Sequence, residues 1–355
     1  MFIESLELNN YRNYKNLSIK FDKKTNLLYG DNAQGKTNIL ESLYVCATTK
    51  SHRGSKDKEL INFENDESHI RVKYKKNNLP YVIDMHLKKN HSKGIAVNGV
   101  VIKKTSELFG KINVVCFSPE DLNIIKEGPA ERRRFVDLEL CQLNSLYVNS
   151  LINYNGIIIQ KNRLLKDAFL NKDVDKMLDV YDEQLEKYGN EIFEFRQNFI
   201  DELNPIINRI HYHLSGEKEK LKLVYERCEF KKQRKEELKI KTSLTGPHRD
   251  DIAFYLNDID LRKFGSQGQQ RTAALSLKLA EIELVKNKID DYPILLLDDV
   301  LSELDTNRQN KILSEINNIQ TIITCTGVED FINNNFNAAR TMFVKDGTVT
   351  AVEAE

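Results

Sequence analysis

The first hundred residues place their hydrophobic side chains in short groups of strand length. Such groups occupy residues 2–8, 17–21 and 27–29, and turns rich in Asn, Asp or Lys separate them. Two further groups follow at 70–74 and 81–87. Apolar groups of this length, bounded by turn residues, predict β-strands. The N-terminal part of the chain is therefore expected to be built mainly on sheets.

The pattern changes to a helical one near residue 118. From there to about residue 214 almost no strand pattern remains, and Pro119 and Pro129 stand where helices could begin. Between Val174 and Leu203 apolar residues recur at steps of three and four, which predicts a long amphipathic helix. Apolar positions between 151 and 169 predict a partner helix, antiparallel because the connection is short.

Strand and helix patterns alternate again after residue 242. Residues 252–261 predict a hairpin, and 269–287 predict an amphipathic helix. Residues 294–297 and 321–324 are fully apolar runs of strand length, which is typical of buried parallel strands. We therefore expect an α/β fold.

The order of these patterns predicts one domain that is split in sequence. Residues 1–117 and 243–355 would form an α/β domain of mixed sheets and helices, and residues 118–242 would form an inserted α-helical lobe. No internal repeat or low-complexity segment interrupts this organisation.

Residues Gly30–Thr37 match the P-loop pattern G-x-x-x-x-G-K-[ST] between a predicted strand and a predicted helix. The glycines allow the backbone to approach phosphate, and the helix N-terminus adds free amides and its dipole. Lys36 is expected to reach the β- and γ-phosphates, and the Thr37 hydroxyl to coordinate Mg²⁺. The expected nucleotide-binding residues here are Gly30, Asp31, Asn32, Ala33, Gln34, Gly35, Lys36, Thr37 and Asn38.

Two acidic residues follow the apolar run at 294–297. Asp298, at the carboxyl end of a buried strand, is expected to hold Mg²⁺ or its bound water beside the phosphates. Asp299 is the candidate catalytic residue that would polarise the attacking water. The alternative is that the two acids simply cap the next turn. Residues 287–290 match the N-K-x-D guanine motif, but they end a predicted helix, so ATP is expected rather than GTP.

A second candidate phosphate site opens the helix predicted at 269–287. Residues 265–271 read G-S-Q-G-Q-Q-R, and a Ser and a Gly at a helix N-terminus leave amides free for an anion. The alternative is an ordinary N-cap loop. The position of this segment shortly before Asp298 favours the phosphate site, as do the following Ser302 and Asp305 in a S-E-L-D sequence.

Composition excludes several classes of protein. No apolar run approaches the length of a membrane helix, and the N-terminus shows no secretory signal, so we expect a cytoplasmic location without membrane contact. The five cysteines are scattered and form no C-x-x-C pair, which gives no support to disulfides or a structural zinc site.

Net charge is zero, so any nucleic-acid surface must be local. Seven basic residues and one acid lie between Arg71 and Lys93. On alternating strand positions they would suit contacts to phosphates rather than to bases, although a solvated surface is the alternative. The candidate DNA contacts are Arg53, Arg71, Lys73, Lys75, Lys76, Lys88 and Lys89.

Two charged segments allow either a structural or a functional role. Residues His248–Asp251 would form an ion-paired turn or an element that faces nucleotide or DNA. Arg132–Arg134 have the same two alternatives, and at most two of the three can share a helix face.

The chain resembles the ABC-type ATPases related to SMC proteins in the order of its motifs. These are the P-loop, the inserted helical lobe, S-x-G-Q, L-L-L-D-D and S-E-L-D. Within these ATPases the chain is most similar to the bacterial RecF family, over essentially its whole length. The segments that carry the likeness are Asn9–Tyr14, Lys50–Arg53, Phe117–Leu122, Glu131–Phe135, Thr245–Asp251 and Ser266–Arg271. SMC proteins would carry hundreds of heptad-repeat residues in place of the lobe.

The resemblance implies an ATP-dependent homodimer that binds DNA in replication and recombinational repair. Each ATP would lie between one subunit's P-loop and the signature Ser266, Gln267, Gly268 and Gln269 of the other. Arg12 would lie near the nucleotide of its own subunit, and Ser302 and Asp305 would contact across the dimer. It also implies action at DNA gaps during DNA damage and the SOS response, and help in loading recombinase together with mediator proteins.

Two departures from the wider ABC pattern predict slow ATP hydrolysis that DNA stimulates. The second acid is Asp299 rather than Glu, and Thr324–Thr326 replace the switch histidine of many ABC proteins. The alternatives are a nucleotide-gated DNA clamp with negligible hydrolysis and the ATPase subunit of an ABC transporter. The transporter is disfavoured by the basic strands, by the large lobe and by the lack of a Gln near Ser118–Glu120.

Overall fold

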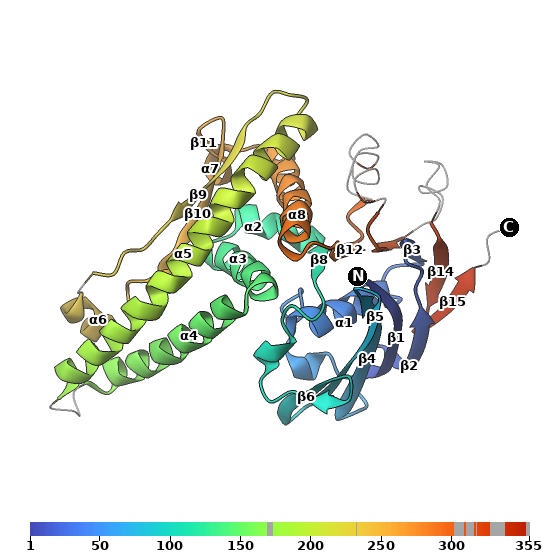
Figure 1. The fold of residues 1–355 in the computed structure, drawn as a ribbon, viewed down its shortest axis with the longest axis horizontal. Coiled ribbons are helices and arrows are strands. Elements are labelled where there is room, and N and C mark those ends of the chain that lie inside the picture. The colour runs from blue at the N-terminus through green and yellow to red at the C-terminus, as the bar shows by residue number, and fades with distance from the viewer. Residues whose placement is uncertain are drawn as a thin grey trace. The chain divides into compact units, whose positions relative to one another are not determined.

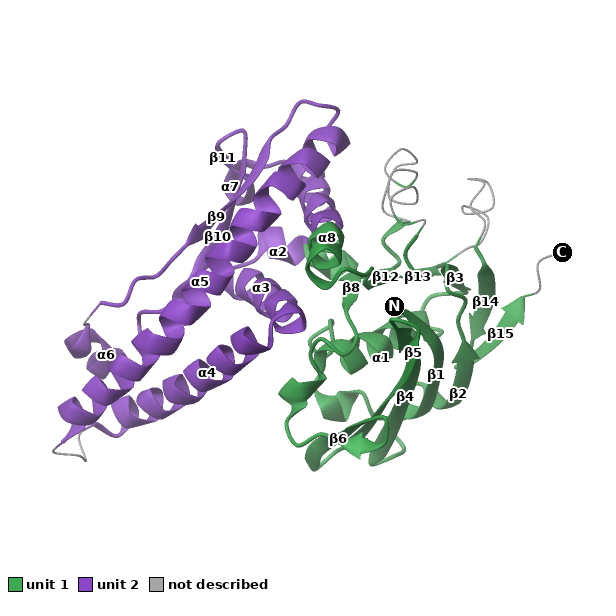
Figure 2. Ribbon diagram, in the orientation of Figure 1, with its two compact units in different colours: residues 1–121, 281–355 green, residues 122–280 purple. Residues whose placement is uncertain are grey.

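The structure is a computed structural model that describes residues 1–168, 173–231, 233–301, 309, 316, 318–326 and 338–352. The chain divides into two compact units (Figure 2). Unit 1 holds residues 1–121 and 281–355, and unit 2 holds residues 122–280. Unit 1 is therefore split in sequence by an insertion, as the order of the patterns predicts.

Unit 1 contains an antiparallel six-stranded sheet of order β2-β1-β4-β5-β6-β7. Every second residue of β4 is buried from Ser68 to Tyr74, which is the alternation of a sheet with one covered face. The turn between β6 and β7 is Asn98-Gly99, where both residues have positive φ angles. Its strands are β1 (Phe2–Tyr11), β2 (Tyr14–Lys20), β4 (Glu67–Lys76), β5 (Leu79–Lys88), β6 (His91–Val97) and β7 (Val100–Val101).

A second six-stranded sheet in unit 1 has the order β15-β14-β3-β13-β12-β8. Its members are parallel except for the final hairpin of β14 and β15. All five residues of β12 and of β13 are buried, as expected for central parallel strands. The strands are β3 (Thr25–Tyr29), β8 (Val114–Phe117), β12 (Ile294–Asp298), β13 (Thr321–Cys325), β14 (Arg340–Lys345) and β15 (Thr348–Val352).

Helix α1 (Lys36–Thr48) contacts strands of both sheets and shares one hydrophobic core with them (Figure 1). Its apolar residues Ile39, Leu40 and Leu43 have no exposed surface. The helix that follows the P-loop is thus fixed from two sides. Short 3₁₀ turns η1 (Asp57–Glu59), η2 (Thr105–Leu108) and η3 (Pro119–Asp121) complete unit 1.

Unit 2 is dominated by the predicted helix pair, α4 (Ser145–Lys166) and α5 (Val174–Leu214), which lie side by side (Figure 1). The Asn144 side chain caps α4 by accepting from the amides of Leu146 and Tyr147. Pro129 begins α3 (Pro129–Leu143), a position where its missing amide is no loss. The other helical elements are α2 (Leu122–Lys126), α6 (Arg234–Ile240), η5 (Pro247–Arg249), α7 (Leu261–Phe264) and α8 (Gln267–Ile289).

The insertion ends at residue 280 rather than at the expected 242. Strand β9 (Leu221–Glu226) pairs in antiparallel register with β10 (Asp251–Leu256), which in turn pairs with β11 (Ile259–Asp260). This three-stranded sheet joins residues on both sides of 242, so the predicted hairpin at 252–261 belongs to unit 2. The sequence analysis does not predict the strand at 221–226, whose outward positions hold Lys222, Val224 and Glu226.

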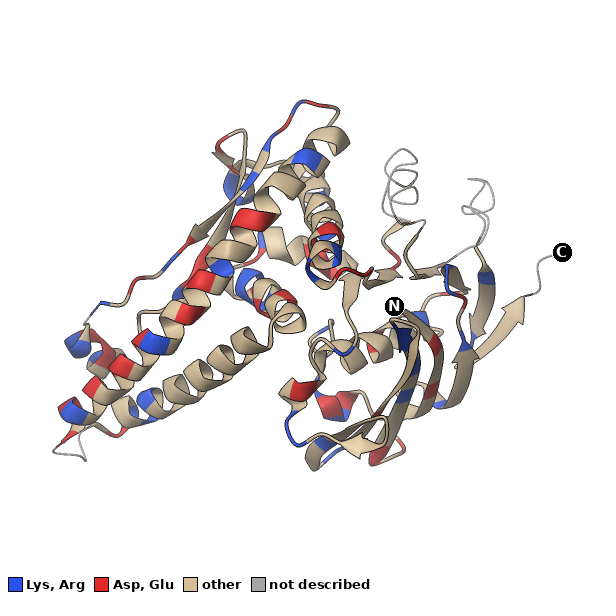
Figure 3. Cartoon of the chain, in the orientation of Figure 1, with Lys and Arg blue, Asp and Glu red and all other residues tan. Residues whose placement is uncertain are grey.

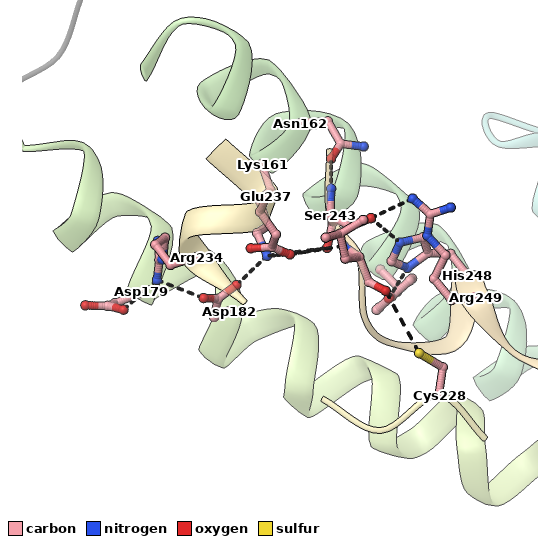
Figure 4. Close-up of polar contacts among 12 residues, drawn as sticks. Lys161, Asn162, Asp179, Asp182, Cys228, Arg234, Glu237, Ser243, His248 and Arg249 are labelled. Carbon is pink, nitrogen blue, oxygen red and sulfur yellow. Dashed lines mark hydrogen bonds and ion pairs between the residues drawn. The ribbon is translucent and has the colours of Figure 1, made fainter. Parts of the chain in front are cut away.

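Buried ion pairs hold the helices of unit 2 together (Figure 4). The Lys161 ammonium lies 2.8 Å from Glu237 and 2.7 Å from Asp182, and both Lys161 and Glu237 are 3% exposed. The carbonyl of Ser243 accepts from His248 Nε2 and from Arg249. His248 Nδ1 therefore accepts from the Tyr154 hydroxyl, and burial lowers the pKa of His248 to about 4.

A second buried network centres on Arg196, whose side chain is 2% exposed. Its guanidinium contacts Asp137 at 2.8 Å and Asp250 at 2.9 Å, and Tyr225 also donates to Asp250. Arg132 forms a bidentate pair with Asp251, and Arg133 donates to the Asp250 carbonyl. The segments His248–Asp251 and Arg132–Arg133 are therefore structural parts of unit 2.

No helix among the described residues is both long enough and apolar enough to cross a membrane.

Candidate nucleotide site

The P-loop connects β3 to α1, and its two glycines stand where no other residue fits. Gly30 has a φ of 152°, and a Cβ there would lie 2.2 Å from the Val344 carbonyl oxygen. Gly35 has a φ of 112°, and a Cβ there would lie 2.6 Å from the Asn13 amide nitrogen. Neither backbone angle suits a residue with a side chain. The close packing of neighbours against the loop explains both glycines.

Two turns of unit 1 hold the P-loop from outside. Asn13, in the β1–β2 turn, donates to the Gln34 carbonyl at 3.0 Å and accepts from Asn38 at 2.8 Å. Gln34 accepts from the Asp346 amide in the β14–β15 turn at 2.6 Å, and Tyr14 donates to the Gly35 carbonyl. Asn13 was not among the predicted site residues, although it lies within the segment Asn9–Tyr14 that carries the family likeness. Its contact with the P-loop depends on long-range packing, which the sequence around Asn13 does not indicate.

Lys36 is directed into the loop that precedes it. Its ammonium donates to the carbonyls of Gly30 at 2.6 Å and Asp31 at 2.8 Å. Burial lowers the pKa of Lys36, and the carboxylate of Asp299, which acts in the opposite direction, does not cancel this effect. The amine thus contacts P-loop carbonyls and lies in the electrostatic field of Asp298 and Asp299, at the carboxyl end of β12.

Asp298 lies within hydrogen-bond distance of the P-loop helix. The Thr37 hydroxyl donates to Asp298 Oδ1 at 2.8 Å, although the two residues are far apart in sequence. Thr324, its register partner on β13, donates to the same oxygen at 2.8 Å and accepts from the Asp299 amide at 3.0 Å. A single buried hydroxyl thereby positions both acids, a role that the sequence did not reveal.

His52 approaches the other oxygen of this carboxylate. Its Nε2 lies 3.7 Å from Asp298 Oδ2, and its ring packs edge-on against Tyr44. Burial alone would raise the pKa of Asp298, but His52 and the hydroxyls of Thr37 and Thr324 outweigh burial and lower it. Asp298 is therefore held as a carboxylate. Lys50–Arg53 belongs to the segments that carry the family likeness, and His52 gives that segment a physical role.

The oxygens of Thr37 and Asp298 form a donor set suited to Mg²⁺. This cation prefers hard oxygen ligands and usually takes one or two from protein, with the rest from phosphates and water. Among the described residues no group of three or more His, Cys, Asp or Glu side chains could hold a metal by itself. A Mg²⁺ ion held by Thr37 and Asp298 would neutralise charge on a transferred phosphoryl group.

Arg12 precedes Asn13, which contacts the P-loop, but the guanidinium of Arg12 binds other groups. It forms a bidentate pair with Glu41 on α1, at 2.8 and 2.9 Å, and Glu41 is fully buried. It also donates to Ser55 and to the Glu59 carbonyl. Its neighbour Asn13, not Arg12 itself, makes the contacts to the P-loop, so a nucleotide-binding role for Arg12 stays a prediction.

The signature segment forms the N-terminus of α8 through a reciprocal pair of hydrogen bonds. The Ser266 hydroxyl accepts from the Gln269 amide at 3.3 Å, and the Gln269 side chain accepts from the Ser266 amide at 2.9 Å. This is a capping box, so the N-cap alternative is correct as a local description. Ser266, Gln267 and Gly268 are nevertheless exposed within the chain, which leaves their surface available to a partner. The predicted contacts Ser302 and Asp305 lie outside the described residues.

Comparison with known proteins decides the family. The model of the "RecF/RecN/SMC N terminal domain" family matches residues 2–350. "DNA replication and repair protein RecF" of Lachnospira eligens is 55% identical over 359 residues, which cover 98% of this chain and 99% of that protein. The chain belongs to the RecF family. The protein of the same name from Clostridium botulinum is 47% identical and covers 93% of this chain and 94% of its own length.

Solved structures agree with this family and with the fold class. A RecF structure titled "Structure of the recombination mediator protein RecF-ATP in RecFOR pathway" matches with a TM-score of 0.93 and 33% identity, over 99% of this chain and 98% of that one. An Smc head domain from Pyrococcus furiosus matches with a TM-score of 0.57 and 17% identity, over 99% and 96%. The ABC-type head with an inserted helical lobe, expected from the sequence, is confirmed.

The basic run proposed for DNA contact in this RecF-family chain is largely neutralised by its neighbours. Carboxylates on β1, β4 and β5, and Asp66 just before β4, pair with its cations; Figure 3 shows basic and acidic residues together in this sheet. The pairs are Arg71–Asp84 at 2.6 Å, Lys73–Glu7 at 3.4 Å, Lys75–Glu4 at 2.9 Å, Lys88–Glu67 at 3.2 Å and Lys89–Asp66 at 3.0 Å. Lys76 donates to the Gly110 carbonyl instead. Of the seven candidates, Arg53 has an exposed side chain and no such partner among the described residues.

Proposed function

We propose that this chain is an ATP-dependent DNA-binding protein of DNA replication and recombinational repair. Family membership over nearly the full length supports this, since the relatives are named DNA replication and repair proteins. The structural relatives are named as recombination mediators with ATP or an ATP analogue. The observation that carries the proposal is the meeting of Lys36, Thr37, Asp298 and Asp299 at one place in unit 1.

ATP would bind with its triphosphate along the P-loop amides and Mg²⁺ between Thr37 and Asp298. The γ-phosphate would then be exposed on one side, because unit 1 supplies only part of its surroundings. The exposed Ser266–Gly268 of a second copy is suited to cover that side with the amides of a helix N-terminus. A phosphate shared by two surfaces would make pairing of the subunits depend on ATP.

Hydrolysis is expected to be slow and to end the pairing. Asp299 would orient water from a backbone position with a φ of 55°, held by the hydroxyl of Thr324. Its carboxylate reaches about one methylene less far than a Glu would. The partners we propose are DNA, a second copy of the chain and recombination mediators, all in the cytoplasm. The transporter alternative receives no support from the comparisons.

ATP-dependent pairing is tested by sedimentation velocity with and without Mg²⁺-ATP. The wild type should change from monomer to dimer when ATP is added, because the γ-phosphate completes the interface. Ser266→Arg should remain monomeric, since a long cation there blocks the approach of the second P-loop. Ser18→Arg, at an exposed position on β2, is the matched control and should behave as wild type. Dimerisation to the same extent with and without ATP, in both the wild type and Ser266→Arg, would refute the proposed pairing.

A further inference from the structure

The segment between α1 and η1 carries exposed cations that differ from those on the strands. We call Lys50, Arg53, Lys56 and Lys58 the basic loop. All four side chains are exposed, and none has a carboxylate within ion-pair distance among the described residues. The loop holds two acids: Asp57 pairs with Lys93 at 2.9 Å, and Glu59 accepts from the Lys56 amide. The basic loop is thus an uncompensated positive surface in a chain of zero net charge.

The backbone of this segment is held firmly at several points. The Ser51 hydroxyl donates to the buried Glu41 on α1, and Arg12 donates to Ser55 and to the Glu59 carbonyl. Lys93 adds a hydrogen bond to the Thr49 carbonyl. Cations on a fixed backbone lose less freedom on binding than cations on a mobile one. The loop is therefore preorganised to contact a rigid, negatively charged partner.

The base of the loop reaches the nucleotide site. His52 precedes Arg53 directly and lies 3.7 Å from Asp298, the proposed Mg²⁺ ligand. Glu41, which Ser51 contacts, belongs to the same helix as Lys36 and Thr37. A ligand on Arg53 would thus be one residue away from a side chain that touches the site.

We propose that the basic loop contacts the phosphate backbone of DNA, and that the paired cations of β4 and β5 do not. The inference rests on the proposed function and locates its DNA contact. Free cations displace the counterions condensed on DNA when they contact its phosphates, whereas each strand cation must first give up its carboxylate partner. The contact to phosphates carries no base preference. Because His52 lies beside Asp298, the same loop connects bound DNA to the Mg²⁺ site.

The test compares two triple variants with the same change in net charge. Arg53→Ala/Lys56→Ala/Lys58→Ala removes three of the four cations of the basic loop, and Lys73→Ala/Lys75→Ala/Lys88→Ala removes three paired strand cations. Affinity for plain and gapped DNA duplexes is measured with Mg²⁺-ATP across a series of salt concentrations. Log affinity falls as log salt rises. In the loop variant this dependence should be less steep, by about three in the slope or about one per lost phosphate contact. The strand variant should lower it by less than about one, since its cations are already paired.

Three outcomes separate this inference from the proposed function. Binding of a fluorescent ATP analogue should be unchanged in both triple variants, which shows that the nucleotide site is intact. If the wild type binds no DNA, the proposed function fails. If the wild type binds DNA and the loop variant binds with an unchanged salt slope, the proposed function stands and the loop assignment is wrong. The assignment would likewise be wrong if the loop variant bound DNA normally but no longer bound a protein partner of the wild type.

Discussion

Lys36→Ala is expected to abolish ATP-dependent behaviour of the protein. The ammonium lies among the Gly30 and Asp31 carbonyls and is the cation within the P-loop that can meet the β- and γ-phosphates. Its loss removes a preorganised charge from the transferred group, which commonly lowers the rate by about 10²–10³-fold. DNA-stimulated phosphate release under saturating Mg²⁺-ATP measures the effect directly.

A surface lysine of unit 1 provides the control for this substitution. Lys20→Ala removes an exposed cation at the end of β2 and should leave phosphate release unchanged. Thermal unfolding without nucleotide should be similar for both variants, so that a loss of activity is not a loss of fold. A Lys36→Ala protein that hydrolyses ATP at the wild-type rate would show that the P-loop is not the site of hydrolysis.

Arg196→Leu is expected to destabilise the protein by about 3–5 kcal/mol, because the substitution leaves the fully buried Asp250 and the partly buried Asp137 without their counterion. Asp250 is fully buried, and the pKa of this group is already raised by burial while Arg196 opposes the shift. Asp137 would lose its contacts to the same guanidinium. The free energy of unfolding from urea denaturation, followed by circular dichroism and by tyrosine fluorescence, measures the loss.

An exposed arginine of the same unit serves as the matched comparison. Arg163 lies in the last turn of α4, and Arg163→Leu should change the free energy of unfolding by less than about 1 kcal/mol. A loss below about 1 kcal/mol for Arg196→Leu would mean that the buried network does not stabilise the fold as argued. It would also reopen a functional role for His248–Asp251.

The sequence predicted those parts of the site that depend on local spacing. Gly30, Gly35 and Lys36 follow from one short motif, and Asp298 follows from its place at the end of an apolar strand. Long-range packing supplied the rest. Thr324 meets Asp298 through strand register, and Asn13 meets Gln34 across a turn, so neither has a signal in its own segment.

The charge of the β4–β5 surface depends on residues outside the basic run itself. The run from Arg71 to Lys93 looks basic along the chain, but Glu4, Glu7 and Glu67 face it across the sheet. Cross-strand neighbours decide the net charge of a sheet surface, and their register is not visible in one strand alone. Likewise, the pairing of β9 with β10 places residues 251–256, which lie beyond the expected end of the lobe at 242, in unit 2.

The most direct test of a shared ATP site is the DNA-stimulated hydrolysis of a mixture of two inactive variants. Lys36→Ala disables the P-loop of one subunit, and Ser266→Arg disables the signature of the other. If each ATP lies between two copies, every dimer of one Lys36→Ala and one Ser266→Arg subunit pairs an intact P-loop with an intact signature at one of its two sites. The mixture should then regain hydrolysis that neither variant shows alone, up to about a quarter of the wild-type rate, since half of all randomly paired dimers are mixed and each has one working site of two. A mixture as inactive as either variant alone would contradict the account.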